Sequence, residues 1–255
     1  MTNVNVIPDL LYPLLTLIVS GCILQGLFIF SEYKKKFVPA VIFKGLASCI
    51  FCILAFISCT FTCTSVLNIT IYCLFIGAVL GALGDVLLNL RFVFKNAAKK
   101  LFLSGIAAFL SGHIFYVITA LWLGSFAGGI SGSSKPEGIL ICLLCTAVAS
   151  FCFLYYVFKK FKVEKAFKIF GVVYISCIFF LTSLAVRNAV IFNFELSEIV
   201  FLIGVVFFTL SDIILIFNTF GNSSKFSLRI ANLSLYYIGQ ILITCFLFFW
   251  NKFLC

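Results

Sequence analysis

The chain has 255 residues, of which 64% are hydrophobic and only 10% are charged, and its mean hydropathy is +1.25. A soluble domain carries roughly 25% charged residues because it must cover its surface with polar groups, so this composition excludes a soluble globular protein. The net charge of +10 does not indicate nucleic-acid binding, because the cations lie in short segments between apolar runs. We expect one all-α membrane domain over residues 1–255.

Proline, charged and polar clusters divide the chain into eight apolar runs. Each run is close to the ~20 residues that a helix needs to cross a bilayer, and lipid admits only helices or closed barrels. Because the runs are long and do not alternate in polarity, we predict a polytopic bundle of eight transmembrane helices. They lie at about 10–30, 38–60, 69–90, 101–124, 138–158, 168–193, 196–218 and 230–250.

The first run has the position of a secretory signal peptide. The segment before it, MTNVNVIPDL, contains no basic residue, and the run is of full spanning length. A cleaved signal peptide instead has a basic start and a shorter apolar centre. We therefore expect a first helix that is retained.

The loops between the runs alternate in charge. The cations are concentrated in alternate loops: SEYKKK (31–36), RFVFKNAAKK (91–100), KKFKVEKAFK (159–168) and GNSSKFSLR (221–229). The other loops, at 61–68, 125–137 and 193–198, hold one lysine and three glutamates. Cytoplasmic loops are rich in Lys and Arg, so we expect the basic loops in the cytoplasm, both termini on the lumenal or outer side, and contact with anionic membrane lipid.

The chain has 12 cysteines, most of them inside apolar runs. Two CxxC pairs, Cys49/Cys52 and Cys142/Cys145, have helical spacing, and such residues act as small hydrophobic groups on one helix face. No cluster of His and Cys with zinc-site spacing accompanies them. We expect no metal and no other cofactor.

Two aspartates lie inside apolar runs, Asp85 in GALGDVLLNL (81–90) and Asp212 in FFTLSDIILIF (207–217). A charge at the bilayer centre costs about 2.5–3.5 kcal/mol on insertion scales and usually faces the protein interior. In the predicted topology both aspartates lie at similar depth in the cytoplasmic half. The same half holds further polar residues of the second, fourth and eighth spans: Lys44, His113, Tyr236, Tyr237 and Gln240. We expect one polar pocket that opens toward the cytoplasm.

Helical spacing agrees with such a pocket. Gly81, Gly84 and Asp85 follow the i, i+3, i+4 pattern of one helix face, which Asn89 continues, and small residues allow close helix approach. Two pairs in other spans each share a face by the same rule: His113 with Tyr116, and Tyr237 with Gln240.

A second interpretation gives these polar residues no chemistry. Asp85–Lys44 and Asp212–Tyr237 would then be hydrogen-bonded pairs between helices, because buried polar groups need partners whatever their purpose. Arg187 differs from them, since it lies near the outer end of the sixth span. We expect it to extend toward the interface, with Glu195 or Glu198 as its partner.

An internal repeat is suggested by one offset. Asp85 and Asp212 are 127 residues apart, and so are His113 and Gln240. Shifting the first four spans by this offset places them on the last four, as in a parallel repeat of two four-helix units. The alternative is coincidence between spans of similar length.

Four motifs together resemble the YhhN family of membrane proteins, whose animal members include lysoplasmalogenases. They are GDVLL (84–88), GHIFY (112–116), SDIIL (211–215) and YYIGQILI (236–243). The motifs occur in order, the span count agrees, and the resemblance extends over essentially the whole chain. Two further positions bear on it: Lys44 precedes Gly45 where members tend to have Lys-Pro, and Arg187 matches an arginine late in the sixth span.

The resemblance implies hydrolysis of the vinyl ether bond of a lysoplasmalogen, a lysophospholipid, to a fatty aldehyde and glycerophosphoethanolamine or glycerophosphocholine. A proton must be delivered to the β-carbon of the vinyl ether. The resulting oxocarbenium-like cation needs a carboxylate nearby that stabilises it, as in glycosidases. Asp85 and Asp212, sharing one proton, would form this pair. His113, Tyr237 and Gln240 would hold water and the carboxylates, with Tyr116, Tyr236, Asn89 and Arg187 in support, and Lys44 would meet the phosphate. The endoplasmic reticulum is the membrane that the resemblance implies.

Two other classes of function stay open. A metal-dependent lipid hydrolase would use His113 with the two aspartates, because a catalytic zinc site has about three protein ligands. A lipid transporter or receptor would also explain intramembrane charges and a parallel repeat.

Overall fold

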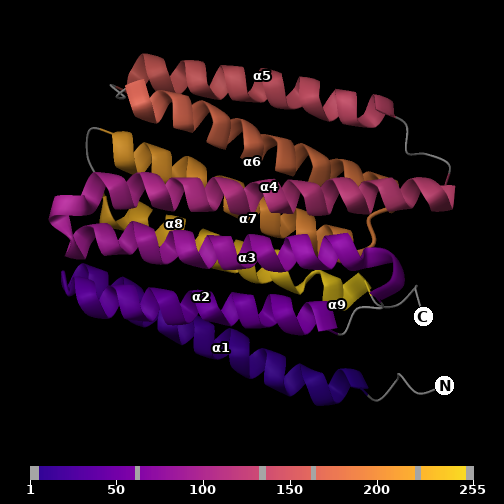
Figure 1. Ribbon diagram of the computed structural model, residues 1–255, viewed down its shortest axis with the longest axis horizontal. Coiled ribbons are helices and arrows are strands. Elements are labelled where there is room, and N and C mark those ends of the chain that lie inside the picture. Colours follow the sequence, from indigo (N-terminus) through magenta and orange to yellow (C-terminus); the bar gives the residue numbers. More distant parts are fainter. Residues whose placement is uncertain (1–5, 61–63, 132–135, 162–164, 222–224, 251–255) are drawn as a thin grey trace.

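The computed structural model describes residues 6–60, 64–131, 136–161, 165–221 and 225–250 (Figure 1). In these ranges it contains eight helices long and apolar enough to cross a membrane, and no strand. Lipid offers the backbone no hydrogen-bond partners, so apolar segments of this length satisfy their own amides as helices. The predicted all-α bundle of eight membrane-spanning helices is confirmed.

The long helices depart from the predicted limits by a few residues at most ends. They are α1 (Val6–Tyr33), α2 (Phe37–Thr60), α3 (Thr64–Val93), α4 (Ala98–Ser131), α5 (Pro136–Lys160), α6 (Lys165–Ile191), α7 (Leu196–Phe220) and α8 (Phe226–Cys245). A 3-10 turn, η1 (Lys95–Ala97), precedes α4, and a short helix, α9 (Leu247–Trp250), follows α8. The eighth apolar segment extends over Phe226–Phe249, close to the predicted span, although the helix is interrupted at Phe246.

The turn between α6 and α7 contains two residues in the left-handed region of backbone conformation. Asn193 and Phe194 both have positive φ, at 50° and 58°. The amide of Phe194 donates to the carbonyl of Ala189 at 2.7 Å. This bond closes the end of α6 with backbone groups alone, so no proline or basic cluster is needed there.

Consecutive helices run in opposite directions, so the bundle has two distinct ends (Figure 1). We call the end where α1, α3, α5 and α7 finish the basic end, because the described residues of all four cation-rich segments lie there. The opposite end holds the start of α1 and the end of α8 (Figure 1). Which side of the membrane each end faces stays a prediction.

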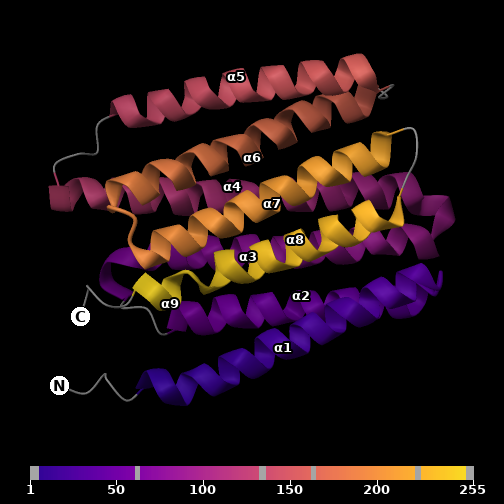
Figure 2. The ribbon, with the colours of Figure 1, turned by 180° about the vertical axis from the view of Figure 1, so that it is seen from behind.

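The two most closely packed helix pairs are α3–α4 and α7–α8. Contacts of α2 with α8 and of α4 with α6 join these pairs into one bundle, and α1 and α5 lie at its outer edges (Figures 1 and 2). Large apolar side chains such as Val148 and Phe151 of α5 are exposed on the outer surface, as expected for a surface that faces lipid.

The same glycine contact occurs in both tight helix pairs. A Cβ atom on Gly112 would lie 3.0 Å from the carbonyl oxygen of Gly77, and one on Gly239 would lie 2.9 Å from the carbonyl oxygen of Gly204. Only glycine allows backbones to approach this closely. Gly77 with Gly204 and Gly112 with Gly239 are each 127 residues apart. This agreement supports the predicted parallel repeat.

Candidate active site

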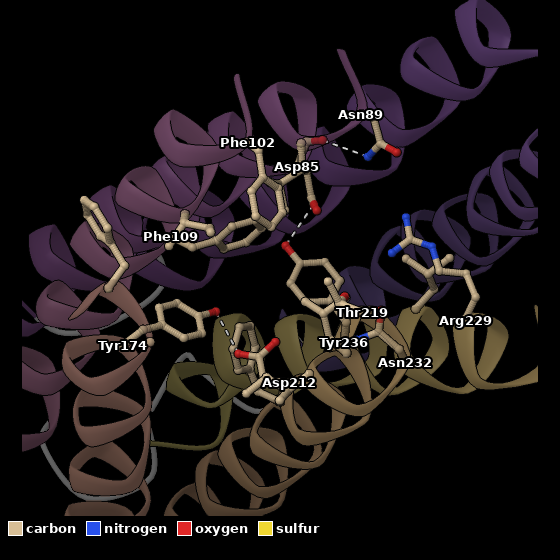
Figure 3. A pocket seen from close by; sticks show the side chains of 18 of the residues that line it. Asp85, Asn89, Phe102, Phe109, Tyr174, Asp212, Thr219, Arg229, Asn232 and Tyr236 are labelled. Atoms are coloured by element: carbon tan, nitrogen blue, oxygen red, sulfur yellow. Dashed lines mark hydrogen bonds between the residues drawn. The ribbon is translucent and has the colours of Figure 1, made fainter. Parts of the chain in front are cut away.

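A pocket lies in the half of the bundle nearer the basic end (Figure 3). Its empty space is about 1070 Å³, including the part that opens outward. Six helices contribute to it: α2, α3, α4, α6, α7 and α8. The lining is mixed, since it contains both apolar side chains, aliphatic and aromatic, and polar ones. The polar residues are Lys44, Asp85, Asn89, Arg91, Tyr174, Asp212, Thr219, Arg229, Asn232 and Tyr236.

Asp85 is held by three side chains. Its Oδ2 accepts hydrogen bonds from the hydroxyl groups of Ser48 at 2.6 Å and Tyr236 at 2.8 Å. Its Oδ1 lies 3.3 Å from the Nζ atom of Lys44. That ammonium group also lies 4.4 Å from the ring centroid of Tyr236, which adds a cation–π contact. The ion pair predicted from the sequence is therefore present and almost fully buried.

Asp212 has a different neighbour. Its Oδ2 accepts a hydrogen bond of 2.7 Å from the hydroxyl of Tyr174 in α6. The predicted pairing of Asp212 with Tyr237 is wrong, because the Tyr237 hydroxyl donates to the carbonyl of Ala47 at 3.3 Å. Successive residues of a helix point about 100° apart, so Tyr236 of α8 faces the pocket while Tyr237 faces α2.

The two aspartates therefore line one pocket from α3 and α7 (Figure 3). Each lies eight residues before the end of its helix, or about 12 Å along the axis, so their depths match as predicted. Each carboxylate has its own tyrosine, and the direct sharing of one proton expected from the sequence is replaced by these two hydroxyl contacts.

Lys44, Asn89 and Tyr236 also line the pocket, whereas five other predicted residues lie outside its lining: His113, Tyr116, Tyr237, Gln240 and Arg187. His113 donates from Nδ1 to the carbonyl of Phe109 at 2.5 Å. The hydroxyl of Tyr116 donates to Oε1 of Gln240 at 2.9 Å. The side chains of His113, Tyr116, Gln240 and Tyr237 thus form hydrogen bonds with one another or with backbone carbonyls. Other residues therefore hold the two carboxylates, contrary to the prediction.

Arg187 lies far from the pocket, near the end of α6 opposite the basic end. Its Nη1 donates to Oδ1 of Asn188 at 3.3 Å, and the side chain lies against Gly124 of α4 and Gly138 of α5. These glycines leave room for the guanidinium between α4 and α5. The predicted pairing with Glu195 or Glu198 is wrong: both Glu198 oxygens are buried without a hydrogen-bond partner in the described part of the chain.

The sequence analysis missed several residues of the site. Ser48 could have been found, because it lies one helical turn after Lys44. Tyr174 could not, because it stands alone in an apolar run. Arg91 and Arg229 were counted only as loop cations, yet both line the pocket at its basic end.

The two arginines differ in their partners. Arg229 donates from Nε and Nη2 to Glu32, with Nη2 and Oε1 3.0 Å apart. Arg91 packs its guanidinium on the rings of Phe92 and Phe102, at 4.7 and 4.5 Å from their centroids. Its Nε is buried and has no hydrogen-bond partner among the described residues. Arg91 thus has at least one donor that no described residue uses.

The residues that the structure describes contain no group of three His, Cys, Asp or Glu side chains close enough to hold a metal ion. His113 packs among aromatic rings instead, 4.5 Å from the ring centroid of Phe208. The ligand set that the metal-dependent alternative needs is not assembled in these parts of the chain.

Comparison with known proteins gives one match. The profile of the YhhN family matches residues 39–246, which include α2 except its first two residues, all of α3 to α8, and every polar residue of the pocket. No curated protein and no solved structure matches the chain. The profile extends over most of the sequence, and the chain belongs to the YhhN family.

Proposed function

We propose that the protein is a lysoplasmalogenase-like hydrolase, which cleaves the vinyl ether bond of a lysoplasmalogen with Asp85 and Asp212. One observation carries this proposal: two buried aspartates from α3 and α7 line a single pocket that also has aliphatic and aromatic side chains in its walls. A vinyl ether needs a proton donor and a group that stabilises a cation. The mixed lining suits a substrate with one polar and one apolar part.

The neighbours of the two aspartates suggest different roles. Asp85 lies beside the ammonium group of Lys44 and accepts from two hydroxyls, which favours its ionised form. Asp212 has the neutral hydroxyl of Tyr174 as its partner. We assign Asp212 as the proton donor and Asp85 as the carboxylate that stabilises the cation and activates water.

The reaction then runs in three steps. Asp212 gives its proton to the β-carbon of the vinyl ether, and the π electrons form the new C–H bond. Water attacks the α-carbon of the resulting oxocarbenium ion and loses a proton to Asp85. The hemiacetal loses its hydroxyl proton to Asp212 while the glycerol oxygen takes the proton from Asp85. The C–O bond to glycerol breaks, which leaves an aldehyde and an alcohol and restores both carboxyl groups.

Arg91 takes the role expected of Lys44, whose charge is already paired with Asp85. Arg91 lies six residues beyond Asp85 on α3, about 9 Å along the axis. The phosphorus and the β-carbon of a lysoplasmalogen are seven bonds apart, roughly 9 Å when extended. A phosphate at Arg91 would therefore place the vinyl ether at the depth of the aspartates. With the basic end in the cytoplasm, the headgroup would come from the cytoplasmic leaflet, and the endoplasmic reticulum is the membrane we propose.

The test is incubation of the purified protein in detergent with two lysophospholipids of equal chain length, one a vinyl ether and the other an ester. We expect free aldehyde from the vinyl ether and no fatty acid from the ester. Release of fatty acid, or absence of both products, would contradict the proposal.

A lipid carrier is the second candidate, and the repeated helix pairs favour it, since parallel repeats are common in carriers. A carrier would move the lysophospholipid between the leaflets of sealed vesicles without changing it. The incubation above separates the two, because only an enzyme produces aldehyde in detergent.

A further inference from the structure

The sequence offset of 127 residues that relates Asp85 to Asp212 also relates Lys44 of α2 to Gly171 of α6. Lys44 fills the space beside Asp85. Gly171 lines the pocket with Asp212, and a Cβ atom built on it would meet nothing within 4 Å. The second half of the molecule therefore has a gap where the first half has a buried side chain.

This gap lies where α4 and α6 diverge. The two helices contact each other in the middle of the bundle, where the rings of His113 and Tyr174 are 5.5 Å apart, and further on through Asn188. Toward the basic end they separate (Figures 1 and 2). Pocket residues of both helices lie in the part where they separate: Phe102 and Ile106 of α4, and Phe170 and Gly171 of α6.

The residues along this divergence suit a hydrocarbon chain. Phe102, Ile106 and Phe170 are apolar and only partly buried, with Phe170 37% exposed. These residues offer no polar groups to hold ordered water, which needs two to four polar partners. The guanidinium of Arg91 lies against the ring of Phe102 at the polar end. A cation next to an apolar channel is complementary to an anionic headgroup that carries one chain.

We propose that the pocket opens sideways between α4 and α6 into the lipid leaflet at the basic end, and that the single hydrocarbon chain of a lysophospholipid lies in this opening across Gly171. The phosphate lies at Arg91, and the His113–Tyr174 contact closes the opening toward the middle of the bilayer. The identity of the lipid rests on the proposed function, but the opening itself does not.

Photolabelling tests the opening without any turnover. The probe is a 1-O-alkyl lysophosphatidylethanolamine with a diazirine in its chain, which has no vinyl ether and cannot be hydrolysed by the proposed reaction. We expect adducts on the peptides that contain Phe102, Ile106 and Phe170, and competition by unlabelled lysophospholipid. Labelling spread evenly over the outer faces of α1 and α5, without competition, would overturn the proposal.

Substitution of Gly171 provides the second measurement. Gly171→Leu and Gly171→Trp fill the gap, and Gly26→Leu and Gly26→Trp are matched controls, because Gly26 of α1 is also helical with nothing within 4 Å of its Cβ position. We expect at least fivefold less labelling of α4 and α6 for the Gly171 variants and no change for the controls. Equal labelling of the Gly171 variants and the wild type would overturn the opening.

Turnover separates this proposal from the enzyme assignment. The Gly171 variants should lose at least tenfold activity on a long-chain lysoplasmalogen but less than twofold on a water-soluble analogue with a four-carbon chain, which can enter from the basic end. Equal loss on both substrates contradicts the opening. Specific labelling together with no aldehyde from either substrate contradicts the enzyme assignment and leaves the opening supported.

Discussion

The α3–α4 and α7–α8 helix pairs cross through the same glycine contact, and each carries an aspartate at the same depth, yet the two aspartates have different surroundings. Asp85 is neutralised by Lys44 of α2, while Asp212 has Tyr174 of α6 and faces the gap at Gly171. The packing of the first half is also tighter, because α2 contacts α3 more extensively than α6 contacts α7. Two similar frameworks thus hold one carboxylate paired with an ammonium group and one carboxylate bonded to a neutral hydroxyl. Such a difference allows one pocket to supply both an acid and a base.

The largest effect is expected from removal of either carboxylate. Asp212→Asn and Asp85→Asn should each lower kcat for aldehyde release by about 10²–10⁴-fold, the usual contribution of acid–base groups. Initial rates in detergent measure this, with size-exclusion profiles as the check on folding. If either folded variant keeps a rate near that of the wild type, the two-carboxylate mechanism fails.

Lys44→Met tests the ion pair that distinguishes the halves. It should lower the free energy of unfolding by about 3–5 kcal/mol, because it leaves a buried charge without its partner. In an Asp85→Asn background the same substitution should cost much less, since the two residues are coupled. Thermal unfolding in one detergent gives the stability of the wild type, the two single variants and the double variant. If the effects of the two substitutions simply add, the coupling between Lys44 and Asp85 is contradicted. Gly171→Ala, at the equivalent position, should cause no loss of stability.

The two glycine contacts should respond alike. Gly112→Ala and Gly239→Ala each place a Cβ atom about 3 Å from a carbonyl oxygen of the facing helix. Each should lower the free energy of unfolding by about 1–3 kcal/mol, as overpacked positions do. Gly26→Ala is the control, because its Cβ would meet nothing. A loss confined to one half would mean that the shared contact is not equally important in both.

The smallest effects concern the two tyrosine hydroxyls. Tyr174→Phe and Tyr236→Phe each remove one hydrogen bond to a carboxylate and should cost about 0.5–1.5 kcal/mol of stability. Their effects on kcat should differ, because Asp85 keeps Ser48 and Lys44 while Asp212 loses the hydroxyl that orients it. We expect the larger fall in kcat for Tyr174→Phe. The reverse order would exchange the roles assigned to the two aspartates.

The site could be anticipated from the sequence only in part. Asp85, Asp212, Lys44 and Asn89 were found because polar residues are rare and costly in apolar runs. Tyr237 was paired with Asp212 in error, and Arg187 with Glu195 or Glu198, because depth along a helix can be counted from the sequence whereas the direction of a side chain around the axis cannot. Tyr174 escaped notice because tyrosine is common in membrane helices and has no distinguishing neighbour.

The sequence by itself determined the eight helices, their order and the common end of the basic loops. The physical reason is that lipid forces each long apolar segment to satisfy its own backbone hydrogen bonds. Only the tertiary structure decided which tyrosine meets which aspartate, that Arg91 lines the pocket, and that α4 and α6 diverge beside Gly171. These features depend on the rotation and tilt of each helix against neighbours distant in the chain, which are set by packing over the whole bundle rather than by any local pattern.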